Sequence, residues 1–236
     1  MSGSAADCRS VCVECGTSCT TLVHDGQGLV RIARCEHCGS VSDKYVEHDT
    51  LFLMIDLLLH RATAYRHLLC NHTLVQQASP LALLHVGAVV AICDVHLKHV
   101  TRIALLGSLA SPSPSPATSL PLGLAWPLLS SAVEFATFTV IATAVSGVTV
   151  GWRRVAIALL YSSVGKSLLA LSMIWDYPAI FGAAIEAFTL SCNTVALRVV
   201  HEPRTLTATR ATIAVVAAAA VRAAVAAVAS GGIRPS

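Results

Sequence analysis

Hydrophobic and polar residues are unevenly distributed along this chain. Up to residue 79, short apolar stretches alternate with polar side chains, whereas long apolar runs fill most of the sequence that follows. Four of these runs are close to the ~20 residues that an α-helix needs to cross the hydrocarbon layer of a membrane. They are residues 128–150, 155–175, 179–197 and 211–229. The pattern therefore predicts four transmembrane helices.

A fifth apolar run, residues 81–106, is a weaker candidate for a membrane span. Asp94, Lys98 and Arg102 lie in its second half, and charges are costly in a lipid environment. The run either crosses the membrane, re-enters it or lies on its surface. The Ser- and Pro-rich residues 111–121 that follow are typical of a flexible loop. We expect a mostly α membrane protein, with a bundle of four to five transmembrane helices in residues 80–236.

Residues 45–71 have apolar positions at helical spacing and polar side chains on the remaining surface, which predicts an amphipathic helix. Asp49 is placed to cap its start. The helix either lies along the bilayer interface or packs its apolar face on the preceding domain. We assign the helix and a linker to residues 44–79. The candidate interfacial or docking residues are Tyr45, Asp49, Asp56, His60, Arg61, Tyr65, Arg66 and His67.

Composition agrees with a membrane protein. Hydrophobic residues make up 55% of the chain and charged residues 12%, well below the roughly 25% charged residues of a typical soluble domain. The net charge of +3 is not gathered into a basic patch with interleaved aromatic residues, which argues against nucleic-acid binding. Residues 1–7 lack the basic and apolar segments of a secretory signal. We expect them to form a disordered tail on the cytosolic side.

Two C-x-x-C-G motifs, at Cys12–Gly16 and Cys35–Gly39, predict a metal site. Their spacing falls within the range of four-cysteine zinc sites, and a glycine after each pair permits a tight bend. Between them, Asp25 and Gly26 are a turn signal that predicts a short hairpin. We therefore predict a zinc ribbon over residues 8–43. The predicted ligands of a structural Zn are Cys12, Cys15, Cys35 and Cys38.

Other uses of the cysteines fit this region less well. Two disulfides are disfavoured in the reducing cytosol. Cys8 and Cys19 are alternative ligands, but their spacing is less suited to paired turns. A site closed by four thiolates leaves no open position for a reacting water molecule, so we expect a structural metal.

Loop charges favour a cytosolic position for the zinc ribbon. If five helices cross, the lumenal loops hold Asp176 and no Lys or Arg, in accord with the positive-inside rule. Asn71 begins a glycosylation sequon, and this topology predicts that it stays unmodified. The arginines that then fall in cytosolic loops are Arg153, Arg154, Arg198, Arg204 and Arg210.

Each of the four stronger spans contains one ionisable residue, and the four lie within about 5 Å of one depth along the helices. They are Glu134, Lys166, Glu186 and Arg222. Two acids and two bases at one level can pair, so we predict an intramembrane polar layer in which Lys166 is paired with Glu134 or Glu186. The layer either locks the bundle or binds a lipid headgroup.

Catalytic motifs are not recognisable in the sequence, and we expect a protein that is not an enzyme. Gly165-Lys166-Ser167 is similar to the end of a phosphate-binding loop, but Leu160 stands where that loop requires its first glycine.

Several motifs of this chain form a recognisable set. They are the two C-x-x-C-G motifs, the segments 45–49, 55–60 and 64–69 after them, and 162–166, 174–177 and 188–193 with Ala196-Leu-Arg198 in the membrane half. Together they resemble the Arv family (ACAT-related protein required for viability), multispanning proteins of the endoplasmic reticulum. The resemblance covers roughly two fifths of the chain.

This resemblance implies intracellular sterol transport and distribution, with sphingolipid homeostasis, through the binding or movement of lipid in the endoplasmic reticulum and also the Golgi membrane. The implied partners are membrane lipids: sterol, sphingolipid or a glycolipid precursor. The alternative is a non-catalytic accessory subunit for glycosylphosphatidylinositol anchor biosynthesis, in which the ribbon and the helix after it dock onto a membrane glycosyltransferase.

Overall fold

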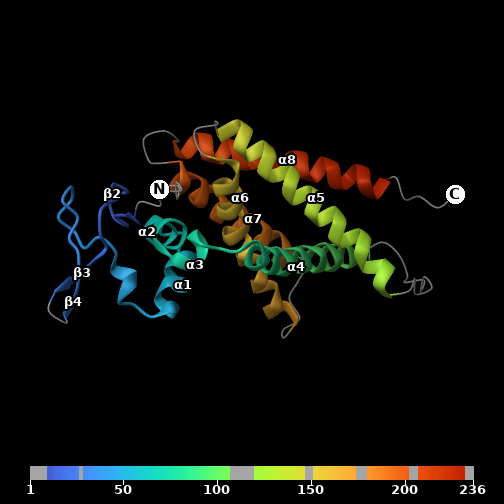
Figure 1. Ribbon diagram of the computed structural model, residues 1–236. Coiled ribbons are helices and arrows are strands. Elements are labelled where there is room, and N and C mark those ends of the chain that lie inside the picture. The colour runs from blue at the N-terminus through green and yellow to red at the C-terminus, as the bar shows by residue number, and fades with distance from the viewer. Residues whose placement is uncertain are drawn as a thin grey trace, which may run out of the picture.

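The protein is described by a computed structural model that covers residues 10–26, 29–106, 120–146, 151–173, 180–201 and 207–231. The described part is mostly helical, as predicted. An N-terminal domain, residues 10–76, carries the strands and several short helices, and a helical bundle, residues 80–231, lies beside it (Figure 1).

Two small antiparallel ribbons form the first part of the N-terminal domain. Strand β1 (Ser10–Val11) pairs with β2 (Ser18–Cys19), and β3 (Val23–Gly26) pairs with β4 (Leu29–Ile32). The second ribbon is the hairpin expected from the sequence. The sequence had suggested that Asp25 and Gly26 form the turn. They are instead paired with Val30 and Leu29, so they belong to strand β3.

The segment predicted as one amphipathic helix is divided into short elements, so that prediction was wrong. His60 has a φ of 56°, a left-handed conformation that a right-handed helix cannot continue. Asp49 occupies the N-cap position as predicted, but its side chain makes no capping hydrogen bond. The elements are η1 (Lys44–Val46), α1 (Thr50–Leu58), α2 (Ala62–Arg66), the π-helix η2 (His67–Asn71) and α3 (Thr73–Gln76).

These short helices pack on the first cysteine motif. Val13, Tyr45, Leu53 and Ala64 form a small buried cluster. The Arg66 guanidinium donates hydrogen bonds to the backbone oxygens of Val13 (2.7 Å) and of the residue after it (2.8 Å). The N-terminal domain is therefore one packed unit in which strands and helices support each other.

The bundle contains α4 (Pro80–Leu106), α5 (Leu120–Ser146), α6 (Trp152–Ser162), the 3₁₀ helix η3 (Ser163–Met173), α7 (Ile180–Val200) and α8 (Ala208–Gly231). Within the described residues, three helices are long and apolar enough to cross a membrane, at Pro80–His99, Ala125–Val145 and Phe181–Val200. The first of them is the run that the sequence ranked weakest. Spans at 155–175 and 211–229 stay predictions.

The described part of the predicted span 155–175, up to residue 173, is not a single α-helix, in contrast to the prediction. The α-helix ends at Ser162 and continues as the tighter η3. At this junction the hydroxyls of Ser162 and Ser163 donate to Oδ1 of Asn193, at 2.6 and 3.4 Å. The Ser162 hydroxyl also lies 3.2 Å from the Leu159 carbonyl of its own helix. Serine hydroxyls that bond to nearby groups in this way, together with close packing on α7, favour the change of helix type.

Helices α6 and η3 together run antiparallel to α7. Val155, near the start of α6, shares a buried cluster with Leu197, whereas Gly165 in η3 lies against Phe188. Residue numbers that rise along one segment and fall along the other define this antiparallel pair. Helix α6 and η3 together therefore lie alongside much of α7.

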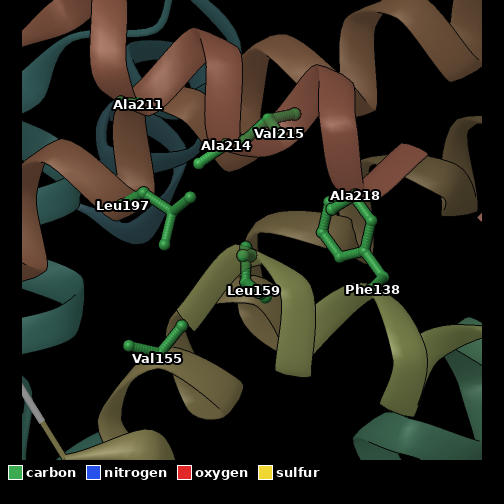
Figure 2. Packing of buried hydrophobic residues seen from close by; sticks show 9 residues of the cluster. Phe138, Val155, Leu159, Leu197, Ala211, Ala214, Val215 and Ala218 are labelled. Atoms are coloured by element: carbon green, nitrogen blue, oxygen red, sulfur yellow. The ribbon is translucent and has the colours of Figure 1, made fainter. Parts of the chain in front are cut away.

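An apolar core joins α5, α6, α7 and α8. Phe138 of α5, Leu159 of α6 and Leu197 of α7 share one buried cluster with a row of alanines on α8 (Figure 2). Alanine has no side chain beyond Cβ, so helices that meet at alanines can approach closely. The Ala-rich C-terminal run is therefore a packing surface. Its buried members are Ala211, Ala214, Val215 and Ala218.

We predict that Gly165→Leu destabilises the bundle. Even a Cβ atom at Gly165 would lie 3.1 Å from Cε1 of Phe188, so a larger side chain must push η3 away from α7. Overpacking of this kind costs about 1–3 kcal/mol, and the melting temperature of the detergent-solubilised protein should fall by several degrees. Gly87→Leu is the matched control, because a Cβ atom at Gly87 meets nothing within 4 Å. An equal effect of both substitutions would contradict this packing.

Candidate functional site

Four cysteine sulfurs converge at the tip of the N-terminal domain. The Sγ atoms of Cys12, Cys15, Cys35 and Cys38 all lie within 4.8 Å of one another. Two pairs are closer: Cys12 to Cys38 at 3.8 Å and Cys15 to Cys35 at 3.7 Å. A tetrahedral Zn–S₄ centre with bonds of about 2.3 Å places its sulfurs about 3.8 Å apart. The four cysteines could therefore hold a metal ion.

The two cysteine motifs adopt the same turn, which explains how the sulfurs meet. Gly16 N–H donates to the Cys12 carbonyl at 2.9 Å, and Gly39 N–H donates to the Cys35 carbonyl at 2.8 Å. Both glycines have positive φ, 79° and 72°, which side-chain-bearing residues rarely adopt. The tight bends predicted from the sequence are present at both positions.

The thiols of the cluster differ in acidity. Burial raises the pKa of Cys12 to about 12. Burial also acts to raise the pKa of Cys15, but hydrogen bonds from the side chain and backbone of Thr17 outweigh it and lower this pKa to about 6. Because metal ligands must be thiolates, binding of a metal would displace a proton from Cys12.

The other cysteines weighed as ligands are not part of this group. Cys19 lies beside Cys35 but outside the group of four, and its thiol donates to the backbone oxygen of Thr17 at 3.7 Å. Cys8 lies outside the described residues. Cys12, Cys15, Cys35 and Cys38 form no disulfide with one another, so the two-disulfide alternative is not what the structure shows.

A second polar cluster lies beneath the first cysteine motif, around the fully buried Asp43. Its carboxylate accepts from the backbone of Tyr45 at 3.0 Å and from Asn71 Nδ2 at 2.6 Å, and lies 2.7 Å from His67 Nδ1. Asn71 also exchanges two hydrogen bonds of 2.8 Å with the backbone of Val11. The sequon asparagine is thus fully used inside the fold, and a missing sugar would not report on topology.

Most of the residues predicted to be interfacial or docking residues hold the helices together. Asp56 accepts a hydrogen bond from the Tyr45 hydroxyl at 2.7 Å and forms an ion pair of 3.3 Å with Arg61. Burial raises the pKa of Tyr45 to about 12. Burial likewise raises the pKa of Tyr65, which packs against Ala158, Cys192 and Ala196 in the bundle. Tyr65 is therefore the centre of the contact between the N-terminal domain and the bundle.

The bundle contains a larger ion network than the sequence predicted. Lys166 binds Asp94, lies 3.7 Å from Glu186, and Glu186 in turn binds Arg222. The sequence had offered Glu134 as one of two possible partners of Lys166, but the structure pairs Lys166 with Glu186 and not with Glu134. Its partner is Lys98, whose Nζ lies 2.6 Å from Glu134 and 2.7 Å from Asp94. Three acids and three bases from α4, α5, η3, α7 and α8 thus form one network.

Asp94 and Lys98 are the functional candidates that sequence reasoning missed. In the sequence analysis their charges weakened the case for a span at residues 81–106. In the structure Asp94 is the partner of Lys166, and Lys98 is the partner of Glu134. Their i, i+4 spacing within an apolar run is a signal of a helical ion pair. That signal could have placed both residues in the polar layer.

Comparison with known proteins gives a consistent similarity. The sequence model of the Arv1-like family matches residues 11–197. Protein arv1 homolog of Dictyostelium discoideum is 30% identical over 84% of this chain and 87% of its own length. Protein ARV 2 of Arabidopsis thaliana is 30% identical over 84% and 86%, and Protein ARV1 of Mus musculus is 27% identical over 83% and 75%. No solved structure matches the chain.

We predict that Cys12→Ser and Cys35→Ser each abolish stoichiometric metal binding. Loss of one of four thiolates opens the coordination shell, and the N-terminal domain loses the folding free energy that a bound metal supplies. Elemental analysis of freshly purified full-length protein measures this. Cys19→Ser is the matched control and should retain the metal, because Cys19 lies outside the cluster. Metal loss from the control but not from Cys12→Ser would contradict the proposed ligand set.

We predict that Lys166→Asp sharply lowers the amount of folded protein, because breaking a buried ion pair costs about 3–5 kcal/mol. Asp94→Lys in the same chain should restore part of it, since the two side chains bind each other. The control is Lys166→Asp combined with Glu134→Lys, which should not recover, because Glu134 is bound by Lys98. Size-exclusion yield in detergent measures all three variants. If Lys166→Asp recovered with Glu134→Lys and not with Asp94→Lys, the pairing described above would be contradicted.

Proposed function

The chain belongs to the Arv1-like family, and from that premise we propose that it is a non-catalytic lipid-homeostasis protein of the endoplasmic reticulum membrane. In this role it binds or moves sterol between membranes and supports sphingolipid balance. The observation that carries the proposal is the continuous family match over residues 11–197, which includes both the cysteine cluster and helix α7 on which α2 packs.

The distribution of side chains supports residence in a lipid bilayer. Large apolar residues are exposed on the outside of α4, α5 and α8, for example Leu84, Val140 and Val216. The acidic groups Asp94 of α4 and Glu134 of α5 are turned inward, where they are buried and paired. Apolar outside and ionic inside is the arrangement that hydrocarbon surroundings favour.

For the cysteine cluster, we propose a structural Zn. Zn is the usual metal of sites with four thiolates, and the sulfur spacing suits its tetrahedral geometry. Bound there, it would supply folding free energy to a domain whose strands are only two to four residues long. In the same proposal the N-terminal domain faces the cytosol, where cysteines stay reduced.

The ion network favours a second candidate role, that of accessory subunit in glycosylphosphatidylinositol anchor biosynthesis. Each charged group of the network has an opposite partner within 4.0 Å. A network that neutralises itself holds helices in register but has little capacity left for a lipid headgroup. Such a bundle suits a protein that positions other membrane proteins.

Reconstitution of the purified full-length chain separates the two roles. Lipid exchange is measured between phosphatidylcholine vesicles that carry a fluorescent sterol and acceptor vesicles without it. We predict that the sterol is exchanged several-fold faster between vesicles that contain the protein than between protein-free vesicles. An inert preparation that co-purifies with a membrane glycosyltransferase in stoichiometric amount would favour the subunit role. Inert vesicles and no such partner would contradict both roles.

A further inference from the structure

Helix α1 presents its apolar side chains outward. Six large apolar residues in and just after the helix are each 44–65% exposed, and within α1 only Leu53 is buried in the domain. The exposed residues are Leu51, Phe52, Met54, Ile55, Leu58 and Leu59. Apolar side chains this close together on a surface indicate contact with an apolar phase or partner.

The charged side chain of α1 points the opposite way. Asp56 faces the domain, where its carboxylate accepts from the Tyr45 hydroxyl and pairs with Arg61, and its side chain is only 16% exposed. A helix on the surface of a water-soluble domain has its charged face outside and its apolar face inside. In α1 this order is inverted, which is what an apolar medium around the helix favours.

The position of α1 beside the bundle identifies that medium. His60, two residues after α1, contacts α7 directly: its Nε2 lies 2.6 Å from the Ser191 hydroxyl, and its ring packs edge-on against Phe188 at 4.9 Å. Both residues belong to the candidate membrane span Phe181–Val200. The polar end of this span is marked by the exposed Arg198. Ser191 lies seven residues before it, about 10 Å along the axis.

The chain after α1 therefore contacts α7 at a level well inside the hydrocarbon layer, and not at its surface. In Figure 1, α1 and α2 lie between the strands and the bundle. The left-handed conformation of His60 turns the chain between them, so that α2 packs on α7 while α1 lies outside this contact. Arg61, half-exposed, has a side chain long enough to reach the headgroup region.

We propose that α1 is inserted among the lipid acyl chains of the leaflet at the Arg198 end of α7. The exposed apolar side chains are covered by lipid, and the N-terminal domain is held on the membrane by α1 as well as by its contact with the bundle. The insertion is independent of which lipid the protein binds or moves, so it stands or falls separately from the proposed function.

Photo-crosslinking tests this insertion. The full-length chain is made with p-benzoylphenylalanine in place of Met54, reconstituted into phosphatidylcholine vesicles and illuminated, and adducts are identified by mass spectrometry. Two matched chains carry the same probe elsewhere. In one it replaces Trp126, an exposed residue of the candidate span in α5. In the other it replaces Glu36, an exposed residue of the N-terminal domain.

We expect lipid adducts at position 54 at a yield similar to position 126 and at least several-fold above position 36, with the new bond on an acyl chain. A yield at position 54 no higher than at position 36 would overturn the proposal. Bonds confined to the headgroup, or adducts to a second copy of this chain or to another protein, would overturn it as well. The probe replaces an exposed apolar residue with another apolar group, and metal content and far-UV circular dichroism check that each chain is folded.

Discussion

A charge that is buried away from water is costly unless it is paired or hydrogen-bonded, and this constraint organises both halves of the protein. In the bundle, Lys166 is buried and is paired with Asp94 and Glu186. In the N-terminal domain, Asp43 and Asp56 face inward and are bonded to neighbouring side chains. These ionic groups are thus held inside, whereas large apolar side chains such as Leu84 and Val140 are exposed on the outside of the bundle.

The two halves are joined by a continuous series of contacts. Arg66 binds the backbone of the first cysteine motif, and its neighbour Tyr65 packs against Cys192 and Ala196 of α7. Six residues before Cys192, Glu186 belongs to the ion network. The geometry of the cysteine cluster and the packing of the bundle therefore depend on one another through α2 and α7. Family membership over residues 11–197 covers this whole series.

Local patterns in the sequence were sufficient for features that depend on neighbours along the chain. The spacing of the four cysteines and the glycine after each pair led to the observed cluster, because a C-x-x-C-G turn is built within five residues. Hydropathy likewise predicted spans at 81–106, 128–150 and 179–197, and the structure has candidate spans at Pro80–His99, Ala125–Val145 and Phe181–Val200. A membrane span can be found in this way because it is a property of consecutive residues.

Features set by contacts between distant segments were decided by the tertiary structure. Asp94 could not be paired with Lys166 from the sequence, because 72 positions separate them and the packing of α4 against η3 brings them together. The contact of His60 with Ser191 likewise joins two positions that lie 131 residues apart. The outward face of α1 has the same origin: periodicity shows that a helix has two faces, but only its packing decides which face the protein covers.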